Sequence, residues 1–431
     1  MRELRHLFVT VFMAELAVFM VAPAMTDVTM SAVCPGQEEC SLAIYLSGFQ
    51  QAITGFGSVV ITPLIGSLSD HYGRKSMLTI PLTISILPLG ILAYSRETNF
   101  FYAYFVVKSI VSMVSDATIV CLALAYVADN ISEEERAAGF GVVSGIMMAS
   151  FVFATFIARF LPTSLTFQVA TFMSMASVVY MRIFLKDKID DNEIDLTRPI
   201  FKIAPNKMPK PSKKIPSVGD VICLLRSSET FSQLAVVAFF QGLCDGGLQS
   251  SAMFYWKARF HFTKNQYANL FLLIGVAGMI SQLILMPLLA SRIREQKLLS
   301  IGLFMSFISM FVNSIAWSDW VPYAATALGI FIYLAHPSLR SIVSKQIGPN
   351  DQGKAQGCIS SISSAATIIS PLIFSPLTAM FLSEEAPFNF PGFSMLCIGS
   401  ASMIAFIQSV MIKPAPTLQH CTNSMEKEEL A

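Results

Sequence analysis

The sequence predicts an all-α membrane protein of about twelve transmembrane helices in two pseudo-symmetric six-helix bundles. The first observation is composition, because 54% of the 431 residues are hydrophobic and 13% are charged. Soluble domains carry roughly 25% charged residues, so this chain has too few charges to cover a soluble surface. The second observation is that apolar runs of about 20 residues, the length that crosses a bilayer core, recur along the chain. The third is a long polar segment that divides these runs six and six.

Each expected helix is an apolar run that ends at polar residues or at proline and glycine. The first run follows Arg2 and Arg5 and lacks a short apolar region with a small-residue cleavage site, so we expect a retained span. The first six runs cover residues 6–28, 43–65, 77–95, 101–126, 138–160 and 164–185. The second six cover residues 230–252, 266–290, 298–317, 321–340, 356–381 and 392–412.

The polar segment predicts the domain organisation. We expect one bundle over 1–185, a flexible linker rich in Lys, Pro and Asp over 186–229, a second bundle over 230–413 and a tail over 414–431. With a cytoplasmic N-terminus, about 23 of the 29 Lys and Arg fall in cytoplasmic segments or helix ends, as the positive-inside rule requires. Both termini and the linker are therefore expected in the cytoplasm. The sequence does not distinguish the plasma membrane from a vacuolar or other internal membrane.

The two halves resemble each other weakly, at an offset of about 216 to 221 residues. "LIGSLSDHYGRKSML" after the second span aligns with "LMPLLASRIREQKLL" after the eighth. "YVADNISEEERAAGFG" before the fifth span aligns with "IVSKQIGPNDQGKAQG" before the eleventh. Because each pair falls on one side of the membrane, the repeats are parallel, related by an axis along the membrane normal.

The stretch "GSLSDHYGRK" between the second and third spans resembles the loop signature G-x-L-[SA]-D-x-x-G-R-[RK] of the major facilitator superfamily. Every defined position is met, by Gly66, Leu68, Ser69, Asp70, Gly73, Arg74 and Lys75. A turn that only fixed topology would need the two cations but neither the aspartate nor the glycines. Within the superfamily, residues 125–141 and 337–357 resemble the tetracycline-efflux-like drug:proton antiporters and their hippocampus-abundant-transcript-like eukaryotic relatives, including plant members.

The resemblance implies a latch on the cytoplasmic side. Asp70 is expected to accept hydrogen bonds from the N-terminal amides of the eleventh span, where the helix dipole favours an anion. Such a contact forms only when the cytoplasmic side is closed, so it would favour an outward-open state. The residues expected on the second half of this gate are Gln352, Gly353 and Gly357. Ser291 stands where the second half would carry the matching aspartate, which predicts a one-sided latch.

Ionisable side chains at membrane depth cost at least about 2.5–3.5 kcal/mol and usually mark a pathway or a relay. The resemblance implies that the first, fourth, seventh and tenth spans line a central cavity. Five such side chains lie on these spans, and they form the candidate proton and substrate site: Glu15, Lys108, Asp116, Asp245 and His336.

These residues have both functional and structural interpretations. Asp116 or Glu15 is expected to carry a coupling proton, since burial favours the uncharged carboxyl. Lys108 would hold one of these carboxylates or an acidic group on the substrate. Lys108 and Asp116 lie eight residues and about 80° apart around the helix, so we expect no direct ion pair. The structural alternatives are a Glu15–Lys108 pair between helices, a satisfied Asp116, an Asp245 that caps a broken helix, and a His336 that marks a kink.

The sequence favours a secondary transporter of a small organic solute, proton-coupled and working by rocker-switch alternating access. An uncoupled facilitator or a transporter-like sensor remains an alternative. Ala154–Arg159 reads "ATFIAR" where antiporters of the family show G-P-x-x-G-G, so the sequence does not assign antiport over symport or uniport. The chain has no G-x-S-x-G, H-E-x-x-H or Walker motif, so we expect neither an enzyme nor an ATP-driven pump.

The expected partners are the solute, protons and the lipid bilayer. We expect no nucleic acid, no cofactor and no metal, and a protein that functions as a monomer. Cys34 and Cys40 lie in a polar loop, "CPGQEEC", and would form a disulfide if that loop faces an oxidising compartment.

Overall fold

The structure is a computed structural model, described here for residues 4–33, 41–186, 229–347, 351–383 and 386–412. Over these ranges every regular element is helical, and twelve segments are long and apolar enough to cross a membrane. The predicted fold class and span number are therefore confirmed. Cys34 and Cys40 lie outside the described residues.

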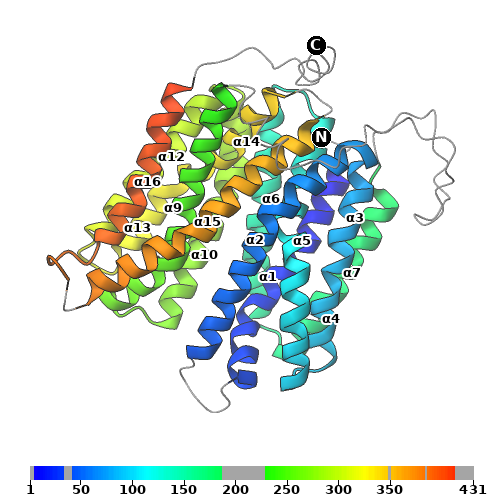
Figure 1. Ribbon diagram of the computed structural model, residues 1–431, viewed down its shortest axis with the longest axis horizontal. Coiled ribbons are helices and arrows are strands. Elements are labelled where there is room, and N and C mark those ends of the chain that lie inside the picture. The colour runs from blue at the N-terminus through cyan, green and yellow to red at the C-terminus, as the bar shows by residue number, and fades with distance from the viewer. Residues whose placement is uncertain (1–3, 34–40, 187–228, 348–350, 384–385, 413–431) are drawn as a thin grey trace, which may run out of the picture.

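Seven helices build the first bundle (Figure 1): α1 (Arg5–Val33), α2 (Ser41–Tyr72), α3 (Arg74–Ile84), α4 (Ile86–Tyr94), α5 (Thr98–Asn130), α6 (Arg136–Ala158) and α7 (Thr163–Phe184). The third span consists of α3 and α4, which meet at Ser85. Within the bundle α1 packs on α6 and α7, and α2 packs on α5.

The second bundle holds α9 (Glu229–Phe260), α10 (Lys264–Ile280), η1 (Ser281–Leu285), α11 (Met286–Ala290), α12 (Glu295–Ser314), α13 (Val321–Leu328), η2 (Gly329–Leu334), α14 (Ala335–Lys345), α15 (Gln352–Leu382) and α16 (Phe393–Met411). Two of its spans are irregular, because η1 is a π-helical turn in the eighth span and η2 is a 3₁₀ turn in the tenth. His336 directly follows this irregularity, whereas α9 runs unbroken through Asp245. The suggestion that Asp245 caps a broken helix is therefore wrong.

The helices extend beyond the apolar runs that predicted them. The second span was expected to end at residue 65, but α2 continues to Tyr72 and carries most of the loop signature as helix. It ends at Gly73, whose φ of 88° lies in the left-handed region that favours glycine. The signature is therefore the last turns of one helix, a single glycine and the first turn of the next.

Each bundle has its own apolar core. Buried clusters surround Leu122 and Phe167 in the first bundle, and Leu339 and Met395 in the second. A smaller cluster joins the bundles through Ala137 of α6 and residues of α11, α12 and η2. The other main contacts between bundles join α15 to α2 and α5, and α6 to α10, η1, α11 and α14.

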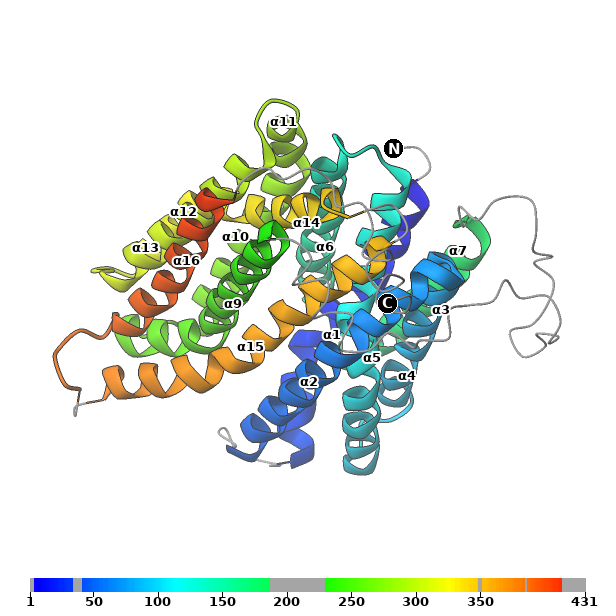
Figure 2. The same ribbon diagram turned by 45° about the horizontal axis from the view of Figure 1, so that its top comes forward.

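The start of α15 lies beside the end of α2 and the start of α3, although the rest of α15 crosses the second bundle obliquely (Figures 1 and 2). The side of the molecule that carries residues 66–75 is called the motif side below. The start of α1 and the end of α16 also lie on this side (Figure 1).

Candidate functional site

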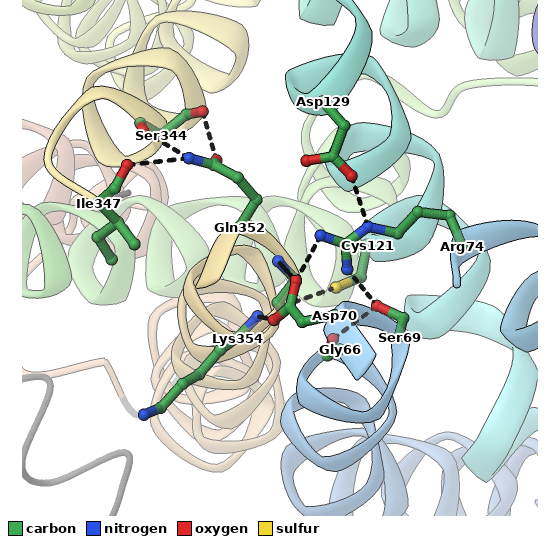
Figure 3. Close-up of polar contacts among 11 residues, drawn as sticks. Gly66, Ser69, Asp70, Arg74, Cys121, Asp129, Ser344, Ile347, Gln352 and Lys354 are labelled. Carbon is green, nitrogen blue, oxygen red and sulfur yellow. Dashed lines mark hydrogen bonds and ion pairs between the residues drawn. The ribbon is translucent and has the colours of Figure 1, made fainter. Parts of the chain in front are cut away.

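A carboxylate joins the two bundles on the motif side (Figure 3). Asp70 accepts a hydrogen bond from the backbone N–H of Gly353 at 2.9 Å and another from that of Lys354 at 3.0 Å. These amides belong to the first turn of α15, where N–H groups lack partners within the helix and the helix dipole favours an anion. The contact is the one that the sequence predicts between Asp70 and the eleventh span. We call it the Asp70 latch.

Arg74 holds the latch from the first bundle. Its buried guanidinium donates to Asp70 and to the Ser69 hydroxyl, and its Nε donates to Asp129 of α5 at 2.8 Å. Ser69 in turn donates to the Gly66 carbonyl at 2.6 Å. Arg74 therefore ties α2, α3 and α5 together around the carboxylate. Lys75, the other cation of the signature, follows it on the first turn of α3.

The latch requires α2 and α15 to approach very closely. A Cβ atom on Gly66 would overlap the Gly353 carbonyl, and a Cβ atom on Gly353 would overlap both the Gly66 carbonyl and the Arg74 guanidinium. Gly357 lies in the same interface, where an added Cβ would come within 2.8 Å of the Pro63 Cα. The Cys121 thiol of α5 is fully buried there, 3.8 Å from the Gly353 carbonyl oxygen.

Gln352, the first residue of α15, holds this helix start in place. Its amide donates to the carbonyls of Ser344 at 2.9 Å and Ile347 at 3.0 Å, and its side-chain oxygen accepts from the Ser344 hydroxyl. Arg136 of α6 donates to the same Ser344 carbonyl from the other bundle, at 3.1 Å. Arg136 and Gln352 occupy aligned positions in the two halves, so the repeats converge on one carbonyl.

The aligned region of the second half carries no such latch over the described residues. The Ser291 hydroxyl donates to the Leu288 carbonyl at the end of its own helix. Glu295 and Lys345, which align with Arg74 and Asp129, form an ion pair at 2.9 Å. In each half an ion pair therefore joins this loop to the neighbouring span. The cation lies on the loop side in the first half and on the neighbouring span in the second half. We call these the reversed pairs.

The Glu295–Lys345 pair predicts the outcome of a charge swap. Glu295→Lys or Lys345→Glu alone places two like charges side by side and is expected to lower the melting temperature. The double variant restores opposite charges and is expected to recover most of the loss, with a coupling on the order of 1 kcal/mol for such a partly buried pair. Thermal unfolding of the four proteins in detergent measures this. A double variant no more stable than the sum of the singles would exclude the pairing.

At membrane depth in the first bundle, Lys108 and Asp116 form an ion pair, with 3.5 Å between Nζ and Oδ1. The prediction that they lie too far apart is wrong, because the lysine side chain spans part of the axial distance and the Cα–Cβ bond of Asp116 tilts back toward it. Glu15 is partly buried and lies within electrostatic range of both. It has no hydrogen bond or ion pair among the described residues, so the alternative of a Glu15–Lys108 pair is also wrong.

In the second bundle the structure brings together two residues that the sequence identified separately. His336 Nε2 of α14 lies 3.1 Å from Asp245 Oδ2 of α9. Their spacing of 91 residues gave no sign of this contact. The side chains of Asp116, Asp245 and His336 are 48%, 47% and 51% exposed, so all three remain accessible.

One charged residue near this site was missed. Arg340 follows His336 by one helical turn on α14, and its Nη1 donates to the carbonyl and side-chain oxygens of Gln356 and to the Ser360 hydroxyl. The positive-inside rule assigned it to a cytoplasmic helix end. The spacing of four from His336 was the signal that could have revealed it.

The comparisons identify the family. The Major Facilitator Superfamily matches residues 7–371. The hippocampus abundant transcript 1 protein of Mus musculus is 25% identical over 346 residues, which are 79% of this chain and 67% of that protein. The class D tetracycline resistance protein of Salmonella ordonez is 25% identical over 384 residues, 87% of this chain and 89% of that one.

A solved structure has the same fold. The human organic anion transporter MFSD10 superposes with a TM-score of 0.76 at 19% identity, over 95% of this chain and 99% of that one. The fucose:proton symporter of E. coli gives a TM-score of 0.69 at 12% identity, over 94% and 98% of the two chains. Family, fold and loop signature agree: the chain belongs to the major facilitator superfamily and is a multi-pass membrane transporter rather than an enzyme.

Proposed function

We propose that the protein is a proton-coupled secondary transporter of a small organic solute that works by rocker-switch alternating access. The motif side is then the cytoplasmic side, with both termini and the linker 186–229 on it. The two bundles, residues 1–185 and 230–413, move relative to each other, and a monomer is the functional unit. Residues 414–431 form a tail. The observation that carries the proposal is that the motif side is closed by the Asp70 latch while Asp116, Asp245 and His336 are about half exposed.

The Asp70 latch adds to the free energy needed to open the motif side. Both of its hydrogen bonds cross from one bundle to the other, so a rocking motion that opens the motif side must break both. A hydrogen bond to a charged group contributes about 1.5–3 kcal/mol. The outward-open state is therefore the favoured state of the empty carrier.

Glu15 is the proposed proton carrier. Asp116 and Asp245 each have a cationic or hydrogen-bonding partner, whereas Glu15 has none among the described residues. A carboxyl without a partner in a medium of low polarity is more stable with its proton on. Glu15 lies on α1 close to the Lys108–Asp116 pair, so its charge also affects that pair.

Two amide variants test the coupling. In proteoliposomes, Glu15→Gln is expected to retain exchange of labelled solute across the membrane but to lose accumulation driven by a pH gradient. Asp116→Asn is the matched control, because it makes the same chemical change at a carboxylate that is already paired. It is expected to weaken transport without removing its dependence on the gradient. If wild-type transport ignores the pH gradient, the protein is a facilitator and the proposed coupling is wrong.

A further inference from the structure

Six ionisable side chains lie near the central site; four of them form two pairs and two have no ionic partner among the described residues. Lys108 pairs with Asp116, and His336 pairs with Asp245. Glu15 and Arg340 remain, and neither is in ion-pair distance of an opposite charge among the described residues. An unpaired acid can keep its proton and become neutral. An arginine stays charged, so Arg340 remains able to bind an anion.

The guanidinium of Arg340 is only partly used by the fold. All three of its hydrogen bonds to Gln356 and Ser360 are made by Nη1. Its Nε and Nη2 make none among the described residues, and neither is among the fully enclosed polar atoms that lack a partner. These two nitrogens form the edge of the guanidinium that matches the two oxygens of a carboxylate. Both donors of this edge are therefore unused by the described residues, and Arg340 is partly exposed.

This edge belongs to the central site. Arg340 and His336 are four residues apart on α14 and lie on one face of the helix. His336 is half exposed beside Asp245, whereas Gln356 and Cys121, which lie on the latch side of Arg340, are fully buried. Arg340 is also within electrostatic range of Cys121 of the first bundle. It therefore lies where the two bundles meet, between the accessible site and the Asp70 latch.

We propose that Arg340 binds the acidic group of the transported solute, and that the substrates are small organic anions, with a carboxylate as the best match. This inference rests on the proposed transport function and names its substrate class. The free Nε–Nη2 edge supports it, because this edge matches the two oxygens of a carboxylate and no acidic side chain of the described residues lies within ion-pair distance of Arg340.

The test compares carboxylates with their own amides. Thermal stability of the purified protein is measured against benzoate, phenylacetate and 2-naphthoate, each beside its neutral amide, and against benzylamine as the cation. A ligand that binds the folded state raises the melting temperature by mass action. We expect at least one carboxylate to stabilise the protein while its amide and benzylamine do not.

Three variants assign the effect to Arg340. Arg340→Gln is expected to weaken carboxylate binding on the order of 30-fold or more, as for loss of one partner of a buried charged contact. Arg340→Lys keeps the charge and is expected to keep part of the affinity. Arg292→Gln makes the same chemical change at an exposed arginine after α11, outside the central site, and is expected to bind as the wild type does. The melting temperature of each variant without ligand reports any loss of fold.

The outcomes separate the inference from the proposed coupling. Carboxylates that stabilise Arg340→Gln as much as the wild type overturn the inference, as does a panel in which only amides or the amine bind, or in which no carboxylate does. Glu15→Gln bears on proton coupling alone. If carboxylate binding does not depend on Arg340 but transport still responds to the pH gradient, the proposed substrate class is wrong and the proposed proton coupling stands. If carboxylates bind through Arg340 but transport ignores the pH gradient, the substrate class stands and the proton coupling is wrong.

Discussion

Asp70→Asn is expected to shift the carrier from closed to open on the motif side by on the order of 100-fold. Asparagine has nearly the shape of aspartate but no charge, so the two N–H donors of α15 lose their charge-assisted acceptor. Two such bonds together contribute about 3 kcal/mol or more, and about 1.4 kcal/mol corresponds to a factor of ten. Transport is expected to fall at least tenfold, because the empty carrier no longer returns to the outward-open state.

Cys121 provides a native reporter for this shift. The thiol is fully buried between the bundles, 3.8 Å from the Gly353 carbonyl, so it becomes reactive only when the motif side opens. Its alkylation, followed by peptide mass spectrometry, is expected to be much faster in Asp70→Asn than in the wild type. Asp319→Asn is the matched control, because Asp319 is exposed and bonds only to Ser318 among the described residues. Equal alkylation rates in all three proteins would show that the Asp70 contact does not hold the bundles together.

Gly353→Ala is expected to disrupt the same interface by steric overlap rather than by charge. The added Cβ would meet the Gly66 carbonyl and the Arg74 guanidinium, so α15 must move away and both latch bonds lengthen. Overpacking of this kind typically costs 1–3 kcal/mol before the lost bonds are counted. We expect transport to fall as far as in Asp70→Asn, with a lower melting temperature as well.

Gly90→Ala controls for the general effect of adding a methyl group to a glycine of a transmembrane helix. No atom of the described residues lies within 4 Å of an added Cβ at Gly90, so this variant is expected to match the wild type in both transport and stability. The double variant of Asp70→Asn with Gly353→Ala is informative too. Because both changes remove one contact, its transport defect should not exceed that of the more severe single variant. Additive defects would indicate that Gly353 acts elsewhere.

The sequence predicted features set by local pattern and left out those set by side-chain direction. The contact of Asp70 with the start of α15 was predictable, because an anion, two glycines and a helix start occur at positions characteristic of the family. The length of α2 was not, since hydropathy ends at residue 65 while Gly73 ends the helix. Asp129 escaped notice because nothing near it in the chain indicates that Arg74 would reach it.

The central charges show the same limit. The spacing of Lys108 and Asp116 correctly placed them on one helix, but helical angles alone excluded an ion pair that the long lysine side chain makes. The Asp245–His336 contact joins two residues that lie 91 positions apart in the sequence, and no motif around either residue predicts it. Arg340 was counted with the positive helix ends, because a rule for topology does not say which cations form ion pairs in the folded protein.

The reversed pairs also bear on how the chain assembles. The two halves are similar enough that the loop after the eighth span could dock on the fourth span, where the loop after the second span belongs. Such an exchange would set Glu295 against Asp129, and the opposite exchange would set Arg74 against Lys345. Each combination brings like charges together in place of the native pairs. Charge reversal therefore makes the native arrangement, in which each loop contacts the span of its own half, electrostatically more favourable than an exchange between halves.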